Sequence, residues 1–143
     1  MSTKPSAPGT PGIDLDQVRT TGDAAVWLRQ EAARHAAEAT TESLPARARA
    51  LGLTGSTLEV YATIVGTYCY PAGIGAELAR LANDYRHPDH QAVDPVPEVH
   101  RLVCGHLADT LGPLAQRLTR LAAIQVHRTS HHARPAAGRS VDL

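Results

Sequence analysis

The chain has 143 residues, which is most simply one domain with a single modest core. Fourteen basic residues balance fourteen acidic ones, so the chain as a whole lacks the strongly basic character of a typical nucleic-acid-binding domain. Only 3% of the residues are aromatic and none is Phe, which predicts a core of Leu, Val, Ile and Ala and leaves little surface on which bases could stack.

The sequence also indicates a compartment. No stretch is apolar for long enough to cross a bilayer, and the N-terminus lacks the basic-then-apolar pattern of a secretory signal. Both cysteines, Cys69 and Cys104, lie among apolar residues, as expected of buried thiols in a reducing compartment. We therefore expect a cytoplasmic protein without membrane contact. The Ala- and Arg-rich, Lys-poor composition is typical of a GC-rich bacterial genome.

The N-terminal segment, residues 1–13, is rich in Ser, Thr, Pro and Gly and is expected to be a disordered leader. A single helical domain is predicted over residues 14–128. Its first helix should begin near Thr20, because Thr20 and Asp23 have the spacing of a capping box. The apolar stripe of this helix consists largely of alanine, and small side chains let a neighbouring helix approach closely.

Two helices are expected next. A short one would have Pro45 in its first turn and end at Gly52, since Pro favours helix starts and Gly favours helix ends. A second would begin at Ser56, which forms a capping box with Glu59. Residues 56–70 also contain several β-favouring types, so a strand is the alternative there. Helix is favoured because capping and periodicity agree.

A further helix is predicted by a single apolar face that ends before His87-Pro88, where the residue preceding Pro is pushed away from helical dihedrals. A Pro-rich loop follows. The face consists of Ile74, Leu78, Leu81 and Tyr85.

The last long apolar stretch, Pro97 to His127, carries leucines that alternate in steps of four and three, the spacing of one helix face. Gly112-Pro113 predicts a kink, or a break into two helices. From residue 129 to 143 we expect a basic disordered tail. The prediction is thus an all-α protein, a small bundle of about five or six helices with disordered N- and C-terminal tails. The leucine seam is Leu107, Leu111, Leu114, Leu118 and Leu121.

The leading functional prediction is a small protein–protein interaction or accessory protein without a cofactor. The leucine seam either fills the chain's own core or, where exposed, forms a homodimer or docks a protein partner. The sequence does not decide whether the chain is an enzyme, but a protein without enzymatic activity is favoured. His35 shares a helix flank with Glu31 and Glu38, but one isolated histidine is not a catalytic site, so a solvated flank is favoured.

A zinc-binding protein is one alternative. His87 and His90 form a close pair in the Pro-rich loop, and His100 and Cys104 lie one helical turn apart. A pair in a turn plus a pair on a helix is how many small zinc sites are built, and all four side chains are suitable ligands.

A DNA-binding regulator is the other alternative. The stretch from Leu53 to Leu81 resembles the opening of winged-helix and helix-turn-helix regulators, which would make the helix beginning near Ile74 the recognition helix. The region from Gly112 to Ser140 has five arginines and no acid, which suits phosphate contacts. A weaker dinucleotide-loop hypothesis rests on Gly73-Ile-Gly75 alone. The candidate nucleic-acid contacts are Arg117, Arg120, Arg128 and Arg134.

Overall fold

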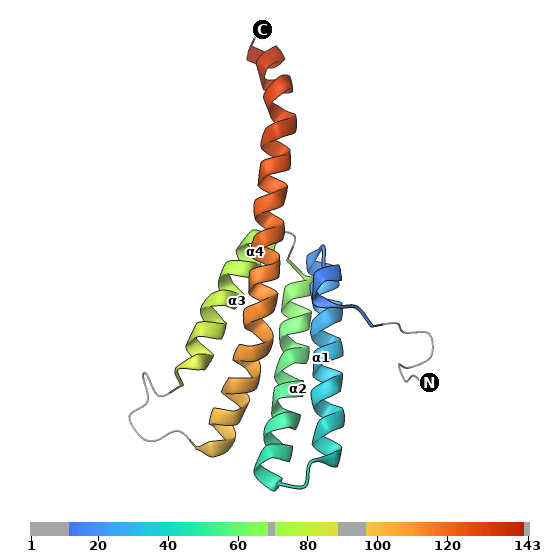
Figure 1. The fold of residues 1–143 in the computed structure, drawn as a ribbon, viewed down its shortest axis with the longest axis vertical. Helices are drawn as coiled ribbons and strands as arrows, with labels where there is room; N and C mark the ends of the chain where they lie inside the picture. Colours follow the sequence, from blue (N-terminus) through green and yellow to red (C-terminus); the bar gives the residue numbers. More distant parts are fainter. Residues whose placement is uncertain (1–11, 69–70, 89–96, 142–143) are drawn as a thin grey trace.

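The computed structural model describes residues 12–68, 71–88 and 97–141, and within them all side chains except that of Ala72 and those of residues 125–141. A short 3-10 turn, η1 (Leu15–Gln17), precedes four helices, and the described residues contain no strand (Figure 1). The helices are α1 (Thr21–Thr41), α2 (Pro45–Gly66), α3 (Pro71–Arg86) and α4 (Glu98–Val141).

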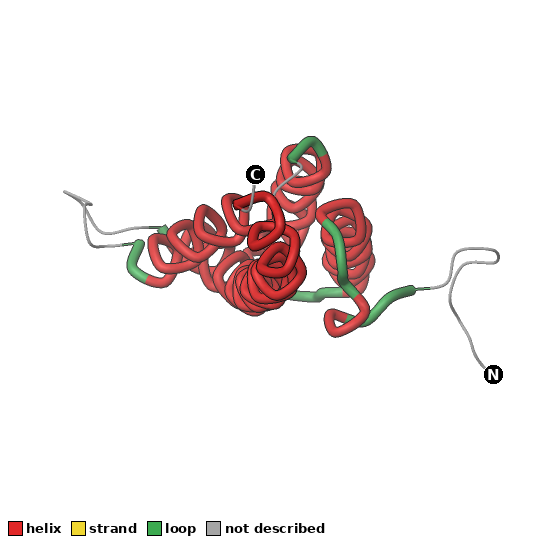
Figure 2. The backbone as a smooth tube through the Cα atoms, turned by 90° about the horizontal axis from the view of Figure 1, so that it is seen from above, coloured by secondary structure: helices red, strands yellow, loops and turns green. Residues whose placement is uncertain are grey.

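The helices form two antiparallel hairpins. Helix α1 packs along α2, and α3 packs along α4, while α2 lies against α4 and joins the two hairpins (Figure 1). Viewed from above, α3 lies on the side of α4 that faces away from α1 (Figure 2). The end of α4 extends well beyond the other three helices (Figure 1).

Helix α1 begins as predicted. Thr20 is its N-cap, and its hydroxyl accepts a hydrogen bond from the backbone N–H of Asp23 at 3.0 Å. The Asp23 carboxylate in turn accepts from the backbone N–H of Arg19 at 3.0 Å, one residue earlier than in a standard capping box. The all-α class is confirmed, and residues 56–66 are helical instead of forming a strand.

The predicted count of five or six helices is too high, because two expected breaks did not occur. The first was at Gly52, which lies inside α2. The Ser56 hydroxyl donates to the Gly52 carbonyl at 3.2 Å instead of capping a new helix. Leu51 and Leu58 are buried on the same side of α2, so packing on both sides of Gly52 holds one continuous helix.

At Gly112-Pro113 a kink or a break was expected, and the break did not occur, because α4 crosses this position as one continuous helix. Gly112 has no Cβ, which removes part of the crowding between a proline ring and the residue before it. Pro113 and Asp109, whose carbonyl loses its usual N–H donor there, both lie on the exposed side. Buried Leu111 and Leu114 keep the two halves of the helix on the same core.

Helix α4 also continues to Val141, where a disordered tail from residue 129 was expected. Extending an existing helix requires no new nucleation, and Ala and Arg are good helix formers. The expected N-terminal leader falls almost entirely on residues 1–11, which lie outside the described residues. Ile13 is fixed by two backbone hydrogen bonds with the Gln30 side-chain amide, at 2.8 and 2.7 Å.

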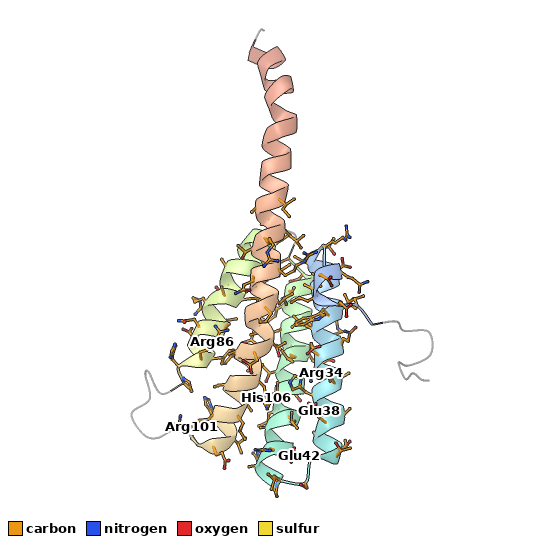
Figure 3. The ribbon with its side chains drawn as sticks, in the orientation of Figure 1. Arg34, Glu38, Glu42, Arg86, Arg101 and His106 are labelled. Atoms are coloured by element: carbon orange, nitrogen blue, oxygen red, sulfur yellow. The ribbon has the colours of Figure 1, made fainter. Side chains whose placement is uncertain are left out.

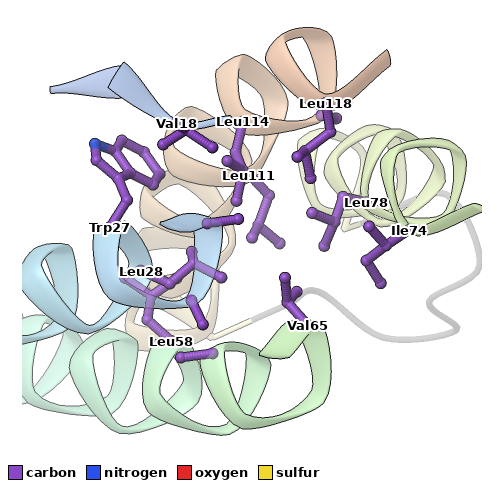
Figure 4. Packing of buried hydrophobic residues seen from close by; sticks show 14 of the residues in the cluster. Val18, Trp27, Leu28, Leu58, Val65, Ile74, Leu78, Leu111, Leu114 and Leu118 are labelled. Carbon is purple, nitrogen blue, oxygen red and sulfur yellow. The ribbon is translucent and has the colours of Figure 1, made fainter. Parts of the chain in front are cut away.

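The core is built almost entirely of aliphatic side chains, as the composition predicted, with Trp27 at its edge (Figure 4). All four helices contribute to it, and α4 contributes the largest group of leucines. Its labelled members include Leu28 of α1, Leu58 and Val65 of α2, Ile74 and Leu78 of α3, and Leu111, Leu114 and Leu118 of α4.

Glycines set the closest helix contacts. A Cβ added at Gly55 of α2 would lie 2.9 Å from the carbonyl oxygen of Ala32 of α1. In the other hairpin, a Cβ at Gly75 of α3 would lie 3.0 Å from the Thr119 hydroxyl and 3.3 Å from the Leu118 Cβ of α4. Gly75 therefore lies inside a helix and serves close packing, which removes the loop geometry that the dinucleotide hypothesis requires.

Candidate functional site

The leucine seam lies in the chain's own core. Leu107, Leu111, Leu114 and Leu118 are at most 2% exposed, and Leu121 is partly buried against the same cluster. The sequence allowed the seam either to fill the chain's own core or to bind a second chain, and the structure shows that it fills the core. A protein-binding surface must therefore be made by other residues.

Such residues occur on the outer side of α2. Four large apolar side chains there, between 41% and 57% exposed, follow one another at helical spacing, with half-buried Thr57 between the first two. The last of them comes just after the end of the helix. We call this surface the α2 stripe, and it consists of Leu53, Thr57, Val60, Ile64 and Tyr68.

Helix α2 is therefore apolar on two faces. Its inner face, with Leu58 and Val65, is fully buried, and its outer face is the α2 stripe. Between Arg49 and Ala76 the only charged residue is Glu59. Glu59 lies 4.0 Å from Arg29 of α1, so its carboxylate points away from the stripe. A helix with this pattern is normally covered on both sides.

A groove extends the α2 stripe onto α4. From α2 it is lined by Leu53 and Thr57, with Arg49 at its edge, and from the beginning of α4 it is lined by Pro97, Val99, His100 and Val103. Its volume is about 490 Å³. The stripe and the groove together form one continuous, mainly apolar surface.

The structure brings together three of the four predicted zinc ligands. His87, His100 and Cys104 line one cavity of about 290 Å³ between the end of α3 and the beginning of α4. His90 lies outside the described residues. Within the described residues, no three His, Cys, Asp or Glu side chains already have an arrangement that would hold a metal ion.

The inner wall of this cavity is uncharged. Cys104 is a free thiol, 4% exposed, and burial raises its pKa. Tyr85 also lies in the wall, and its hydroxyl shares a 2.5 Å hydrogen bond with the Tyr61 hydroxyl of α2. Burial is the largest of the effects that raise the pKa of Tyr85, and the hydrogen bond to Tyr61 adds to it. The thiol is therefore protonated near neutral pH when nothing is bound to it.

His35 is buried, at 4% exposed, so the expectation that it lies on a solvated flank is wrong. Its Nδ1 lies 2.8 Å from the Glu31 carbonyl oxygen, which fits an Nδ1–H donor. Its ring meets the ring of His106 of α4 edge to face, with centroids 5.4 Å apart. The sequence did contain the signal, because Leu28, Ala32 and His35 follow one another in steps of four and three.

His106 lies in an environment that favours its neutral form. Desolvation lowers its pKa, and the charge of His35 acts in the same direction. The carboxylates of Asp109 and Glu38 partly oppose this, whereas Arg34 adds to it. Figure 3 shows His106 at the same height of the bundle as Arg34 and Glu38. The histidine pair is thus a polar contact between α1 and α4.

The predicted nucleic-acid arginines do not act as a group in the described structure. Arg117 donates from Nε to the Val18 carbonyl at 2.9 Å and from Nη2 to the Asp16 carbonyl at 2.7 Å, which ties the η1 segment to α4. Arg120 is exposed. The side chains of Arg128 and Arg134 lie outside the described part of the chain.

The arrangement of α2 and α3 also differs from a helix-turn-helix. That motif crosses its helices at about 90–120°, whereas α2 and α3 run in opposite directions along one bundle (Figure 1). The exposed side of α3 carries Arg80 between two acids, paired with Glu77 and, at 3.0 Å, with Asp84. Around Arg80 the exposed side of α3 is therefore not basic.

Comparison with known proteins adds no identity: no family model, no curated protein and no solved structure matches the chain. None of the described helices combines the length and the apolar character needed to cross a bilayer. The function must therefore be inferred from the arrangement of the residues.

Proposed function

We propose that this chain is a protein-binding helical bundle that pairs with a second copy of itself through the α2 stripe. The observation that carries the proposal is the row of large apolar side chains exposed along one uncharged helix face. Single exposed apolar residues are common on monomers, but a contiguous row of them marks an interaction surface.

The chemistry of the stripe favours a second copy as the occupant. An uncharged apolar surface is best covered by another one, because a charged partner group would lose its water without gaining a counter-ion. The same stripe on a second copy meets this requirement, and a two-fold axis places identical patches opposite each other. The formal net charge of zero means that long-range repulsion between copies is small.

An antiparallel pairing of the two α2 helices matches four of the five stripe residues to one another, while Tyr68 of one copy lies opposite Arg49 of the other. With the two-fold axis between Leu58 and Glu59, Leu53 of one copy lies opposite Ile64 of the other. Thr57 then lies opposite Val60 in the same way. Stable interfaces bury about 800 Å² per partner, more than one helix face provides, and the adjoining groove supplies further apolar surface.

The first test replaces a central residue of the stripe by a charge. Val60→Glu should convert a dimer into a monomer in sedimentation velocity across a wide range of protein concentration, because it places an unpaired carboxylate in the interface. The matched control is Val26→Glu on α1, a valine that is also about half exposed but lies off the stripe. It should leave the dimer intact. A wild-type chain that is monomeric throughout, or a dimer lost only in the Val26 variant, would contradict the proposal.

A second test addresses the orientation. In a chain with Cys69→Ser, the single variants Leu53→Cys and Ile64→Cys are oxidised separately and then as a mixture. Antiparallel pairing predicts disulfide dimers mainly in the mixture, because residue 53 lies opposite residue 64 and disulfides require close Cα atoms. Parallel pairing predicts that each variant cross-links to itself. That result would preserve self-association but refute the antiparallel arrangement.

A further inference from the structure

The two hairpin partners α3 and α4 carry nitrogen and sulfur donors on opposite walls of one cavity. His100 and Cys104 are one turn apart on the same side of α4, and His87 directly follows the last residue of α3. All three line the cavity of about 290 Å³. The two α4 donors are held at a fixed spacing by the helix, and the third comes from the neighbouring element.

We propose that His87, His100 and Cys104 bind a divalent cation of the zinc class, with a fourth coordination position left to water. Two imidazole nitrogens and one thiolate suit a borderline-soft ion, whereas Mg²⁺ and Ca²⁺ prefer oxygen ligands. Three protein ligands and one open position form a common zinc arrangement. This inference rests on a different cavity from the self-association proposed above, although His100 lines both that cavity and the groove beside the α2 stripe.

The cavity admits such an ion. His100 is exposed at its rim and Cys104 is buried in its wall, so the cavity leads from the surface to the sulfur. Among the described residues, no lysine or arginine lines it. Asp84 also lines it, and its carboxylate, which pairs with Arg80 at 3.0 Å, adds negative potential near the ion.

Coordination requires the three side chains to close around the ion, because the described residues show no ready-made set of three ligands. His100 and His87 are both exposed residues, and His87 directly follows the last residue of α3. The ion would then join the end of α3 to the beginning of α4. This is the part of the hairpin where the first turns of α4 contain no buried residue.

The test uses Co²⁺ as a spectroscopic probe of the full chain. One equivalent should give visible ligand-field bands together with a near-ultraviolet thiolate-to-cobalt charge-transfer band, and Zn²⁺ should displace it with one ion per chain by native mass spectrometry. Cys104→Ser should remove the charge-transfer band, whereas Cys69→Ser should keep it. His100→Ala, a change at an exposed side chain, should weaken binding at least about 100-fold, the upper end of what loss of an outer-shell partner produces.

Two results would overturn the proposal. One is a chain that takes up neither Co²⁺ nor Zn²⁺ while its far-ultraviolet circular dichroism shows it to be folded. The other is binding that survives His87→Ala and His100→Ala but is lost in His131→Ala, which would move the site to the histidines near the C-terminus. If the buried substitution Cys104→Ser prevents folding, His100→Ala still tests the proposal, because His100 is exposed and its replacement alters no buried residue.

Discussion

Two segments of helix α4 serve different purposes. From Leu107 to Leu118 every fourth or third residue is a leucine, and these leucines are buried. At the beginning of the helix, from Glu98 to Val103, no residue is buried, and cavities lie between this segment and the neighbouring helices. The leucine segment stabilises the bundle, and the first segment leaves donor groups and apolar surface accessible.

The difference teaches where substitutions matter. Buried leucines that contact one another leave cavities when they are truncated, whereas a side chain at the rim of an existing cavity can be changed at small cost in stability. Both proposals concern the beginning of α4 and the helices beside it. Apart from Cys104→Ser, the variants of described residues in their tests change exposed side chains and leave the core intact.

The largest effect on stability should come from the leucine segment of α4, Leu107 to Leu118. Leu114→Ala should lower the free energy of unfolding by about 2–5 kcal/mol, because Leu114 is fully buried and its truncation leaves a cavity. Urea denaturation followed by circular dichroism measures this change. Ile124→Ala on the same helix, where the side chain is 48% exposed, is the control and should stay within about 0.5 kcal/mol.

Equal losses for Leu114→Ala and Ile124→Ala would show that the two regions of α4 do not differ in packing. A loss within about 0.5 kcal/mol for Leu114→Ala alone would mean that the leucine seam is not the core.

The second effect concerns the α1–α2 hairpin, in which a glycine of α2 lets the backbones of the two helices come close together. Gly55→Ala should destabilise the protein by about 1–2 kcal/mol, since a Cβ 2.9 Å from the Ala32 carbonyl forces the helices apart and outweighs the gain in helix propensity. Gly52→Ala, three residues earlier, has nothing within 4 Å of its added Cβ and should stabilise by up to about 1 kcal/mol. Opposite signs in the same denaturation assay are the expected result, and a stabilising Gly55→Ala would refute the close contact.

Much of the fold could be read from local patterns. The capping residues at Thr20, the apolar face of α3 and the leucine seam each carried a periodic or capping signal, and each gave the right element. The helix end predicted at Gly52 was wrong, and of the kink or break predicted at Gly112-Pro113 the break did not occur, because burial on both sides of these positions outweighs the local cost of Gly and Pro in a helix. Such burial depends on the partner helices, which local patterns do not reveal.

The candidate sites were less predictable. Spacing placed His100 and Cys104 on one face, and the fold then brought His87 to the same cavity. The α2 stripe was missed because α2 carries apolar residues on two faces, and only the position of α2 in the bundle shows which of these faces remains uncovered. The pairing of His35 with His106 joins residues far apart in the chain, and no local pattern contains it.

The smallest effect we predict is a pH dependence at the His35–His106 contact, on the accessible side of α4. The folded protein lowers the pKa of His106, through desolvation first and then the charge of His35, below its ordinary value of 6.5. As pH falls below about 6.5, the unfolded chain therefore binds more protons at this position than the folded one. Stability should fall through this window, level off below the folded pKa, and be restored above 6.5.

His106→Gln tests this directly, because glutamine does not titrate. The loss of unfolding free energy between pH 7.5 and pH 5.5 (values chosen to bracket the ordinary pKa) should be smaller in the variant than in the wild type. The comparison is needed because the chain has eight histidines, and the others contribute to the total slope. An NMR titration of the His106 ring gives the second measurement. A midpoint above 6.5 would reverse the sign of the argument, because the carboxylates of Asp109 and Glu38 would then outweigh desolvation and the charge of His35.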